Sequence, residues 1–400
     1  MLTARQIELI KATVPVLKEH GVALTTHFYK RMLNGNPELK NVFNQAHQAQ
    51  GQQQKALAGA VLAYAENIEN PMVLLGAVKH IAIKHATINI RPEQYDIVGR
   101  HLLASIKEVL GDAATDELID AWAAAYQQLA TILIGVEADI YKDHVNTEGG
   151  WAGWRPFAVV ARKAETDDVV SFTLKPVDGG KVAKALPGQF LSVQNYLEDR
   201  KMLQPRQYTI TEATDESYRI TVKRLDSAKH TVPGAMSTHL HNNIEIGDIL
   251  QVSAPTGEFV IQDNDKPVIF LSAGIGITPI LPMLRHVADT TPNRSVTFLY
   301  TTTDHDHFPL KTEVKPTLGR LTNKRCAVFL TNDTHQCSCG CGRLGRIDKE
   351  VLAGLNLDKT ADVYICGPVK FMQDMRAALT EEGFAAEQIH SEVFGTGTMA

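Results

Sequence analysis

Apolar residues recur at three- and four-residue steps through most of the first 140 positions of the chain. This spacing is the period of one buried face of an α-helix. Turn-forming residues interrupt the pattern at 34–37, 70–71, 91–92 and 111–112. We therefore predict an all-α domain of several mid-length helices over residues 1–147.

A different pattern begins after Glu148-Gly149-Gly150-Trp151. Short runs rich in β-branched and aromatic residues follow one another, with Gly, Pro and Asp between them. Strands at this spacing are typical of a closed antiparallel β-barrel. We predict that barrel over residues 151–262, with its strands at 157–164, 169–177, 189–196, 206–213, 218–225 and 248–255.

A third pattern occupies residues 263–400. Four continuous apolar runs, which favour strands buried on both faces, alternate with helical segments. This alternation predicts a doubly wound α/β domain with a parallel sheet. The runs are 267–274, 295–302, 325–332 and 361–368.

Composition changes this picture only by excluding some classes of protein. The 400 residues are 44% hydrophobic and 21% charged, with a net charge of −5 and no concentrated basic segment. That balance disfavours a nucleic-acid partner. The N-terminus lacks the apolar core of a secretory signal, and no apolar run reaches the roughly 18 residues that span a bilayer. We expect a cytoplasmic protein without a membrane span.

A glycine-rich turn, residues 272–279, joins a predicted strand to a predicted helix. Glycines let backbone N–H groups approach a phosphate, and a helix N-terminus favours negative charge. The loop at 366–368 follows the last predicted strand, at the sheet edge where such folds bind ligands. A plain tight turn is the alternative. The candidate phosphate-binding residues are Gly274, Ile275, Gly276, Ile277, Thr278, Pro279, Cys366 and Gly367.

The barrel carries a second candidate site. Arg206-Gln207-Tyr208-Thr209, preceded by 187–190 and followed by the 233–238 turn, resembles the flavin signature of the ferredoxin–NADP reductase-like family. A guanidinium can pair with a pyrophosphate, and a tyrosine offers a flat face to a flavin ring. The alternative is a strand that happens to contain Arg and Tyr. The candidate FAD-binding residues are Phe190, Arg206, Gln207, Tyr208, Thr209 and Ser237.

The C-terminal segment Glu392-Val393-Phe394-Gly395-Thr396 is similar to the terminal aromatic segment of the same reductase family. The resemblance implies that it lies near the flavin and the nicotinamide site. Val393 and Thr396 depart from the usual Glu-Cys-Phe-Gly-Pro form.

His85 ends an apolar run, and taken alone it is most simply a satisfied histidine on a helix. The residues before it resemble a globin. Residues 36–39 with Phe43 resemble the C helix and the corner whose Phe packs on haem, and Tyr29 stands where bacterial globins carry a distal tyrosine. Gln53 and Leu57, four residues apart on one helix face, match the distal Gln and Leu. His85 then falls at the position of the haem-iron ligand, with His80 and His101 as rivals.

The whole chain therefore resembles the flavohaemoglobin family, in which a globin precedes an FAD barrel and an NAD(P) domain. The resemblance implies that Tyr95 and Glu137 hydrogen-bond the proximal histidine, which makes the imidazole a stronger donor. It also implies that Lys84 influences redox properties, although a solvated lysine fits the sequence nearly as well.

The resemblance implies nitric oxide dioxygenase activity: NO and O2 become nitrate at haem b iron, which NAD(P)H reduces through FAD. Detoxification of NO under nitrosative stress, and O2 binding, would follow. The sequence leaves NADH and NADPH both open. Two other functions also stay open: an oxygen carrier or gas sensor, and a general flavin reductase acting on ferric iron, quinones or hydroperoxides.

Two further expectations concern cysteines and partners. Three of the five cysteines, Cys337, Cys339 and Cys341, form a C-x-C-x-C run that is outside the family pattern. A variable exposed loop and a metal or redox site are both open for this run. We expect a monomer without an obligate protein partner, acting on the small molecules NO and O2.

Overall fold

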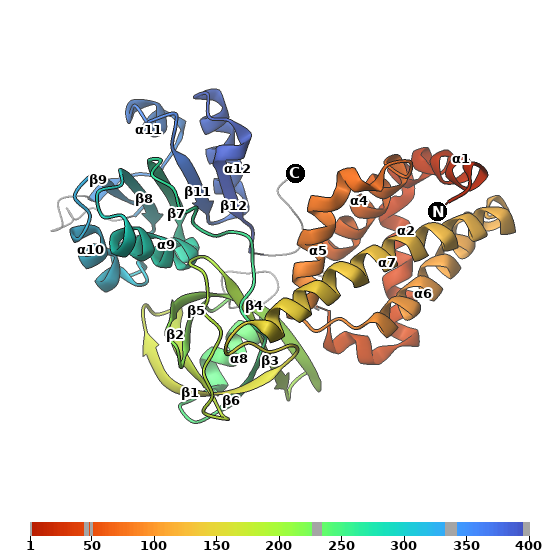
Figure 1. Ribbon diagram of the computed structural model, residues 1–400, viewed down its shortest axis with the longest axis horizontal. Helices are drawn as coiled ribbons and strands as arrows, with labels where there is room; N and C mark the ends of the chain where they lie inside the picture. The colour runs from red at the N-terminus through yellow and green to blue at the C-terminus, as the bar shows by residue number, and fades with distance from the viewer. Residues whose placement is uncertain (1, 44–47, 49–50, 226–233, 333–341, 395–400) are drawn as a thin grey trace. The chain divides into compact units, whose positions relative to one another are not determined.

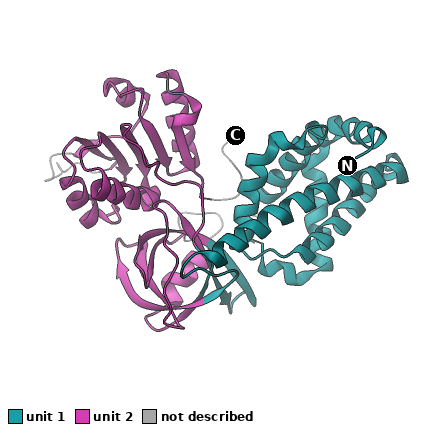
Figure 2. Ribbon diagram, in the orientation of Figure 1, with its two compact units in different colours: residues 1–155, 192–206, 251–254 teal, residues 156–191, 207–250, 255–400 magenta. Residues whose placement is uncertain are grey.

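The computed structural model of the protein describes residues 2–43, 48, 51–225, 234–332 and 342–394 (Figure 1). The chain forms two compact units, shown in different colours in Figure 2. Unit 1 comprises Met1–Arg155, Ser192–Arg206 and Gln251–Ala254, and unit 2 comprises Pro156–Leu191, Gln207–Leu250 and Pro255–Ala400. Parts of the barrel strands therefore pack with the helical region, a division that the sequence pattern does not predict.

The helical region of unit 1 has the all-α architecture that the sequence predicts. Its elements are α1 (Ala4–Ala12), α2 (Val14–Gly35), η1 (Pro37–Asn41), α4 (Gln52–Glu66), η2 (Pro71–Leu74), α5 (Leu75–Thr87), α6 (Pro92–Leu110), η3 (Gly111–Ala113) and α7 (Asp116–Asn146). Helix α2 packs along α4 and α6, and α7 packs on α5 and α6. Among the described residues, no helix is long and apolar enough to cross a membrane.

Local sequence explains where these helices begin and end. The Thr3 side chain accepts a hydrogen bond from the backbone N–H of Gln6 and so caps α1. Pro92 occupies the first turn of α6, where its missing N–H has no cost. Gly111 follows α6 with φ of 54°, a backbone conformation that favours glycine. These signals place His85 near the C-terminal end of α5 and Tyr95 in the first turn of α6.

The six predicted strands of the middle region form a closed barrel in the order β1-β2-β5-β4-β3-β6, and the pairs β1·β2, β2·β5, β4·β5 and β3·β6 are antiparallel. A closed barrel leaves no exposed sheet edge. Helix α8 was not predicted from the sequence. The elements are β1 (Arg155–Ala164), β2 (Val169–Pro176), β3 (Phe190–Leu197), β4 (Met202–Ala213), β5 (Tyr218–Lys223), α8 (Ala235–Asn243) and β6 (Ile249–Val252).

The C-terminal region is a six-stranded sheet in the order β10-β9-β8-β7-β11-β12, and its pairs are parallel. The strands are β7 (Val268–Ala273), β8 (Val296–Thr302), β9 (Lys324–Leu330), β10 (Gly342–Leu344), β11 (Asp362–Cys366) and β12 (Ile389–Glu392). The sequence predicts four of them; β10 and β12 have only three and four residues, too short to show a pattern.

Helices cover both faces of this sheet (Figure 1). Phe270 and Phe298 lie in one apolar cluster with α9 and α10, whereas Ile269 and Leu299 lie in a second cluster with α11 and α12. Because both faces are buried, the strands are continuously apolar rather than alternating. The helices are η4 (Gly274–Gly276), α9 (Ile277–Thr290), α10 (Lys311–Gly319), α11 (Lys349–Gly354), α12 (Val369–Glu381) and η5 (Ala386–Gln388).

Candidate functional site

Three side chains from three helices meet at His85. The His85 Nδ1 lies 2.8 Å from Oε1 of Glu137 and 3.0 Å from the hydroxyl of Tyr95. The Tyr95 hydroxyl donates to the same Glu137 oxygen at 2.5 Å. Tyr126 in turn donates to the backbone oxygen of Tyr95 at 2.6 Å and steadies the start of α6. The family resemblance predicts that Tyr95 and Glu137 contact His85, and in the structure the three side chains are in hydrogen-bond contact.

The chemistry of this cluster fixes which histidine nitrogen is available to a ligand. Glu137 is 2% exposed and, as a carboxylate, accepts the Nδ1–H of His85. That hydrogen bond leaves Nε2 of His85 with the lone pair that a metal requires. Burial, followed by the hydrogen bond to Glu137, raises the pKa of Tyr95, so its hydroxyl stays protonated and donating.

The rival His101 is occupied at both ring nitrogens. Its Nδ1 lies 2.7 Å from Nη1 of Arg31, and its Nε2 lies 3.0 Å from Oδ1 of Asn36. Because arginine only donates, Nδ1 must accept and Nε2 must carry the proton. His101 is therefore a structural histidine and not a candidate ligand. The other rival, His80, lies five residues before His85 on α5, which places it on a different side of that helix.

Helices α2 and α4 carry the residues predicted for the other side of the haem. The ring of Tyr29 meets that of Phe43 edge to face, with centroids 5.6 Å apart and an interplanar angle of 82°. Leu57 packs on the same apolar cluster, and Gln53 lies one turn before it on α4. Tyr29 is 8% exposed, and burial raises its pKa. All four predicted residues thus belong to one region of the helical unit.

Among the described residues, two polar groups in this region have no protein partner. The Oε1 of Gln53 is buried without a hydrogen bond. Within the described part of the chain, the Tyr29 hydroxyl likewise makes none. Unpaired buried polar groups are costly and typically mark a place where a ligand completes the network. The residues present therefore fit a haem: Nε2 of His85 could hold its iron, and these polar groups could hydrogen-bond a small ligand.

Lys84 is half-buried on α5 beside His85, and its predicted influence on redox properties stays a prediction.

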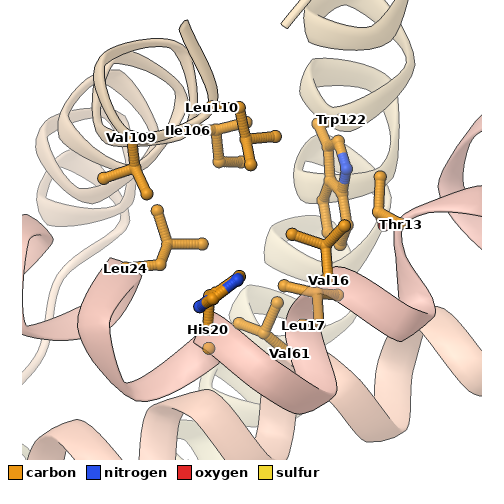
Figure 3. A pocket seen from close by; sticks show the side chains of 11 residues that line it. Thr13, Val16, Leu17, His20, Leu24, Val61, Ile106, Val109, Leu110 and Trp122 are labelled. Atoms are coloured by element: carbon orange, nitrogen blue, oxygen red, sulfur yellow. The ribbon is translucent and has the colours of Figure 1, made fainter. Parts of the chain in front are cut away.

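A separate apolar cavity opens between α2, α4, α6 and α7 (Figure 3). It is lined by Leu17, Leu24, Val61, Ile106 and Trp122 among others, and by none of the predicted haem residues. The side chain of His20 also lines it.

The predicted flavin-binding residues lie on two strands and one helix. Phe190 begins β3, and residues 206–209 form consecutive positions on β4. The half-buried Arg206 donates from Nη1 to the oxygen of Pro205 at 2.5 Å and from Nη2 to Oε1 of Gln204 at 3.2 Å. Ser237, in the first turn of α8, accepts from the N–H of Leu225 at 3.2 Å. Their contact with FAD stays a prediction, as does that of Gln207, Tyr208 and Thr209.

The two loops predicted for the nicotinamide dinucleotide are neighbours at the carboxyl edge of the parallel sheet. Ser272 of β7 pairs with Cys366 of β11, which pairs in turn with Glu392 of β12. A Cβ on Gly276 would overlap the backbone oxygen of Cys366, so only glycine allows this approach. Gly274 has φ of 53°. The turn therefore favours glycine at both positions: at 276 because of the close approach to Cys366, and at 274 because of the left-handed backbone conformation.

The rest of this loop cluster is also ordered by hydrogen bonds. Thr278 donates to the oxygen of Ile275 at 2.9 Å, and the Cys366 thiol lies 3.5 Å from the oxygen of Glu392. Burial raises the pKa of Cys366, which stays a thiol.

The other predicted residues of this region differ in exposure. Val393 packs on the sheet, whereas Phe394 is 46% exposed. Ile277 and Pro279 are buried in α9, and Gly367 closes the second loop.

Some predicted positions lie outside the described residues, namely Gly395, Thr396 and the three cysteines Cys337, Cys339 and Cys341. Two residues that contact these sites were not predicted. Tyr300 on β8 donates from its hydroxyl to the oxygen of Gly274 at 3.0 Å and so holds the turn. Gln204 on β4 accepts from Arg206. Neither residue belongs to a motif, and each acts on a segment remote in sequence.

Comparison with known proteins gives three family matches. The globin family matches residues 26–133, the oxidoreductase FAD-binding domain matches residues 156–261, and the oxidoreductase NAD-binding domain matches residues 270–377. A flavohemoprotein of Bordetella pertussis is 47% identical over 405 residues and covers 100% of both chains. The protein belongs to the flavohemoprotein family. A second family member, from Chromobacterium violaceum, is 44% identical over 99% of both chains.

Solved structures agree with membership of the flavohemoprotein family. A flavohemoglobin of Malassezia yamatoensis, with bound FAD and heme, matches 98% of this chain and 100% of that one, with a TM-score of 0.88 and 31% identity. The FAD/NAD-binding domain of a nitric oxide dioxygenase from Vibrio cholerae matches 60% of this chain and 98% of that one, with a TM-score of 0.56 and 32% identity. A globin joined to an FAD- and NAD-binding oxidoreductase module is thus the family architecture.

Proposed function

We propose that the protein is a nitric oxide dioxygenase that converts NO and O2 to nitrate with electrons from NADH or NADPH. The observation that carries the proposal is the shared carboxylate: Glu137 Oε1 accepts hydrogen bonds from both His85 and Tyr95. A carboxylate partner makes an imidazole ligand more electron-donating, which favours oxygen activation over reversible storage. The fused reductase module supports the same conclusion.

Three cofactors fit the residues present. When bound, the haem supplies a redox-active iron, FAD converts a hydride into single electrons, and the nicotinamide supplies the hydride. His85 would hold the iron through Nε2, and Arg206 would hold the FAD pyrophosphate. The turn around Gly274 and Gly276 would take the nicotinamide pyrophosphate.

Two polar side chains of this protein could hold a bound gas molecule such as O2. Tyr29, kept protonated by burial, presents an O–H donor beside the ring of Phe43. The Gln53 amide lies one turn from Leu57 and has an unpaired buried oxygen. Together these groups can hold a polar diatomic ligand, while the apolar side chains around them exclude water. The overall reaction balances when two NO and two O2 become two nitrate ions and a proton for each NAD(P)H oxidised.

The experiment measures NO consumption by the purified protein with NAD(P)H, in the presence and absence of O2. We expect rapid consumption only when all components are present, and its loss in His85→Ala. An oxygen carrier or sensor would not consume NO catalytically with NAD(P)H. A general flavin reductase would oxidise NAD(P)H with ferric iron or quinones equally well in His85→Ala, and that result, with slow NO consumption by wild type, would overturn the proposal.

A further inference from the structure

Gln204, on β4, is a fully buried amide that reaches a segment 164 residues earlier in the chain. Its Nε2 donates to the backbone oxygen of Lys40 at 3.0 Å and to that of Leu203 at 2.8 Å. The same nitrogen lies 3.4 Å from the backbone oxygen of Phe43. Beside it, the N–H of Leu203 donates to Oδ1 of Asn41 at 2.9 Å. Two adjacent residues of β4 thus hold the segment 40–43.

The backbone oxygens of Lys40 and Phe43, which lie near the Gln204 amide, are at or just beyond the end of the short helix η1. Element η1 ends at Asn41, and the N–H groups of Val42 and Phe43 both donate to Leu39, at 3.0 and 3.3 Å. The last carbonyls of a helix have no partner within the helix. Gln204 therefore donates to the end of η1 from outside the helix, and losing it would remove a buried hydrogen bond to Lys40.

The other end of the Gln204 amide faces the predicted flavin site. Its Oε1 accepts from Nη2 of Arg206 at 3.2 Å. Residues 192–206 belong to the same compact unit as the helices (Figure 2), so these contacts lie inside unit 1. One amide consequently bridges the guanidinium predicted to hold the pyrophosphate and the backbone of the globin segment.

Phe43 extends the bridge into the predicted haem pocket. Its backbone oxygen lies next to Gln204, while its ring packs edge to face on Tyr29. A shift of the segment 40–43 would therefore move the aromatic ring that borders the distal tyrosine. Buried hydrogen-bond networks of this kind are rigid when every member is satisfied.

We propose that Gln204 is a positioning residue that couples flavin binding at Arg206 to the segment 40–43 of the globin, and so sets the rate of electron transfer from FAD to haem. An anionic pyrophosphate on Arg206 changes how the guanidinium engages Gln204 Oε1, and the amide transmits that change to the Lys40 and Phe43 carbonyls. The proposal rests on the cofactor sites of the proposed function, but it does not depend on NO.

The first test is hydrogen–deuterium exchange on the full-length haem-loaded protein, with and without FAD. The reporters are the backbone N–H groups of Val42 and Phe43. We expect FAD to slow their exchange in wild type by about tenfold, within the usual range of coupling between two sites. In Gln204→Ala that FAD-dependent protection disappears, although FAD still binds.

The second test separates the two electron transfers by rapid mixing with NADH in the absence of oxygen. We expect flavin reduction to be unchanged in Gln204→Ala and the following haem reduction to slow by about fivefold or more. The matched control is Gln388→Ala, because Gln388 also donates to two backbone oxygens, those of Lys359 and Ala361, both at 2.9 Å. Gln388 lies in η5, which leads into β12 of the C-terminal sheet, so the control should leave haem reduction unchanged.

Gln204→Met keeps the proposal testable if Gln204→Ala does not fold. The uncharged thioether fills a similar volume but has no N–H donor for the oxygen of Lys40, while Arg206 keeps its bond to the oxygen of Pro205, so FAD binding persists and protection of 40–43 is lost. FAD-dependent protection equal to wild type in either folded variant, or haem reduction equal to that of Gln388→Ala, would overturn the proposal. If wild type shows the FAD-dependent protection and the Gln204-dependent haem reduction but does not consume NO, only the proposed function is overturned.

Discussion

The hydroxyl of Tyr95 lies 2.5 Å from Oε1 of Glu137, and His85 Nδ1 lies 2.8 Å from the same oxygen. One buried carboxylate oxygen therefore serves two donors from α5 and α6. The negative charge of this carboxylate polarises the imidazole. The charge of Glu137 should therefore affect the donor strength of His85 more than the shape of its side chain does.

Glu137→Gln keeps the shape of the side chain and removes its charge. We expect a lower iron–histidine stretching frequency in the ferrous haem-loaded protein, and about 10- to 100-fold less activity, the usual effect of losing such a partner. Resonance Raman spectroscopy measures the frequency. Tyr141→Phe is the control, because the Tyr141 hydroxyl donates to the oxygen of Ile90 and not to the cluster. An unchanged frequency in Glu137→Gln would remove the carboxylate from this role.

Tyr29→Phe should speed the dissociation of O2. The variant loses only a hydroxyl, whose pKa burial raises and which is therefore available as a donor. Loss of one such hydrogen bond to a bound ligand corresponds to about a tenfold faster dissociation. Tyr64→Phe is the control: Tyr64 is equally buried, but its hydroxyl donates to the oxygen of Ala125. Equal O2 dissociation rates in Tyr29→Phe and wild type would exclude Tyr29 from the ligand site.

Two glycines of one turn should respond differently to alanine. In Gly276→Ala the new Cβ meets backbone atoms of Cys366 and Gly367, so the two loops must separate. In Gly274→Ala the Cβ meets nothing within 4 Å, and only the left-handed backbone conformation is strained. We expect the KM for NAD(P)H to rise by about tenfold or more in Gly276→Ala and less in Gly274→Ala, since the left-handed region costs an ordinary residue only about 1–2 kcal/mol.

Steady-state reduction of an artificial electron acceptor by NAD(P)H measures this KM without involving the haem. The haem absorption spectrum should be the same in both variants and in wild type. A KM in Gly276→Ala no higher than in Gly274→Ala would show that the approach of the two loops does not shape the dinucleotide site.

The sequence predicts the fold well because each region repeats one periodicity. All six barrel strands and the four long parallel strands are found where the pattern places them. The strands β10 and β12 were missed because they are too short to show a period. The helix α8 was not predicted because its nine residues, Ala235–Asn243, are mostly polar and show no clear apolar period.

The site was less predictable because its geometry depends on contacts remote in sequence. From the sequence, His101 is disfavoured as a ligand only by its place beyond the Pro92 break; its partners Arg31 and Asn36, 70 and 65 residues away, are shown by the structure alone. Gln204 was missed for the same reason. The sequence correctly assigns β3 and β4 to the barrel, but it does not show that residues 192–206 also pack with the helices.

His101 should make the stability of the protein depend on pH. Burial, and then the neighbouring Arg31, lower its pKa in the folded state below the ordinary value of 6.5. The folded protein therefore resists a proton that the unfolded chain accepts, so stability is complete above about pH 6.5 and falls as the pH drops through the folded-state pKa. We expect the free energy of unfolding of wild type to decrease from pH 7.5 to pH 5.5.

His101→Gln removes the titrating group, while its amide can still accept from Arg31 and donate to Asn36. Urea unfolding of both proteins at the two pH values isolates the contribution of His101 from that of other histidines. The decrease should be smaller in the variant. An equal decrease in the two proteins would mean that His101 contributes nothing to it.

The most direct measurement for the central claim is the isotopic composition of the product. The protein is supplied with NADH or NADPH, unlabelled NO and dioxygen labelled with a heavy oxygen isotope, and the nitrate is analysed by mass spectrometry. A dioxygenase predicts nitrate that carries both labelled atoms of one O2, formed in a ratio of two nitrate ions to each NAD(P)H oxidised, and only when His85 is present. Nitrate without the paired label, or nitrate formed equally by His85→Ala, would contradict the account.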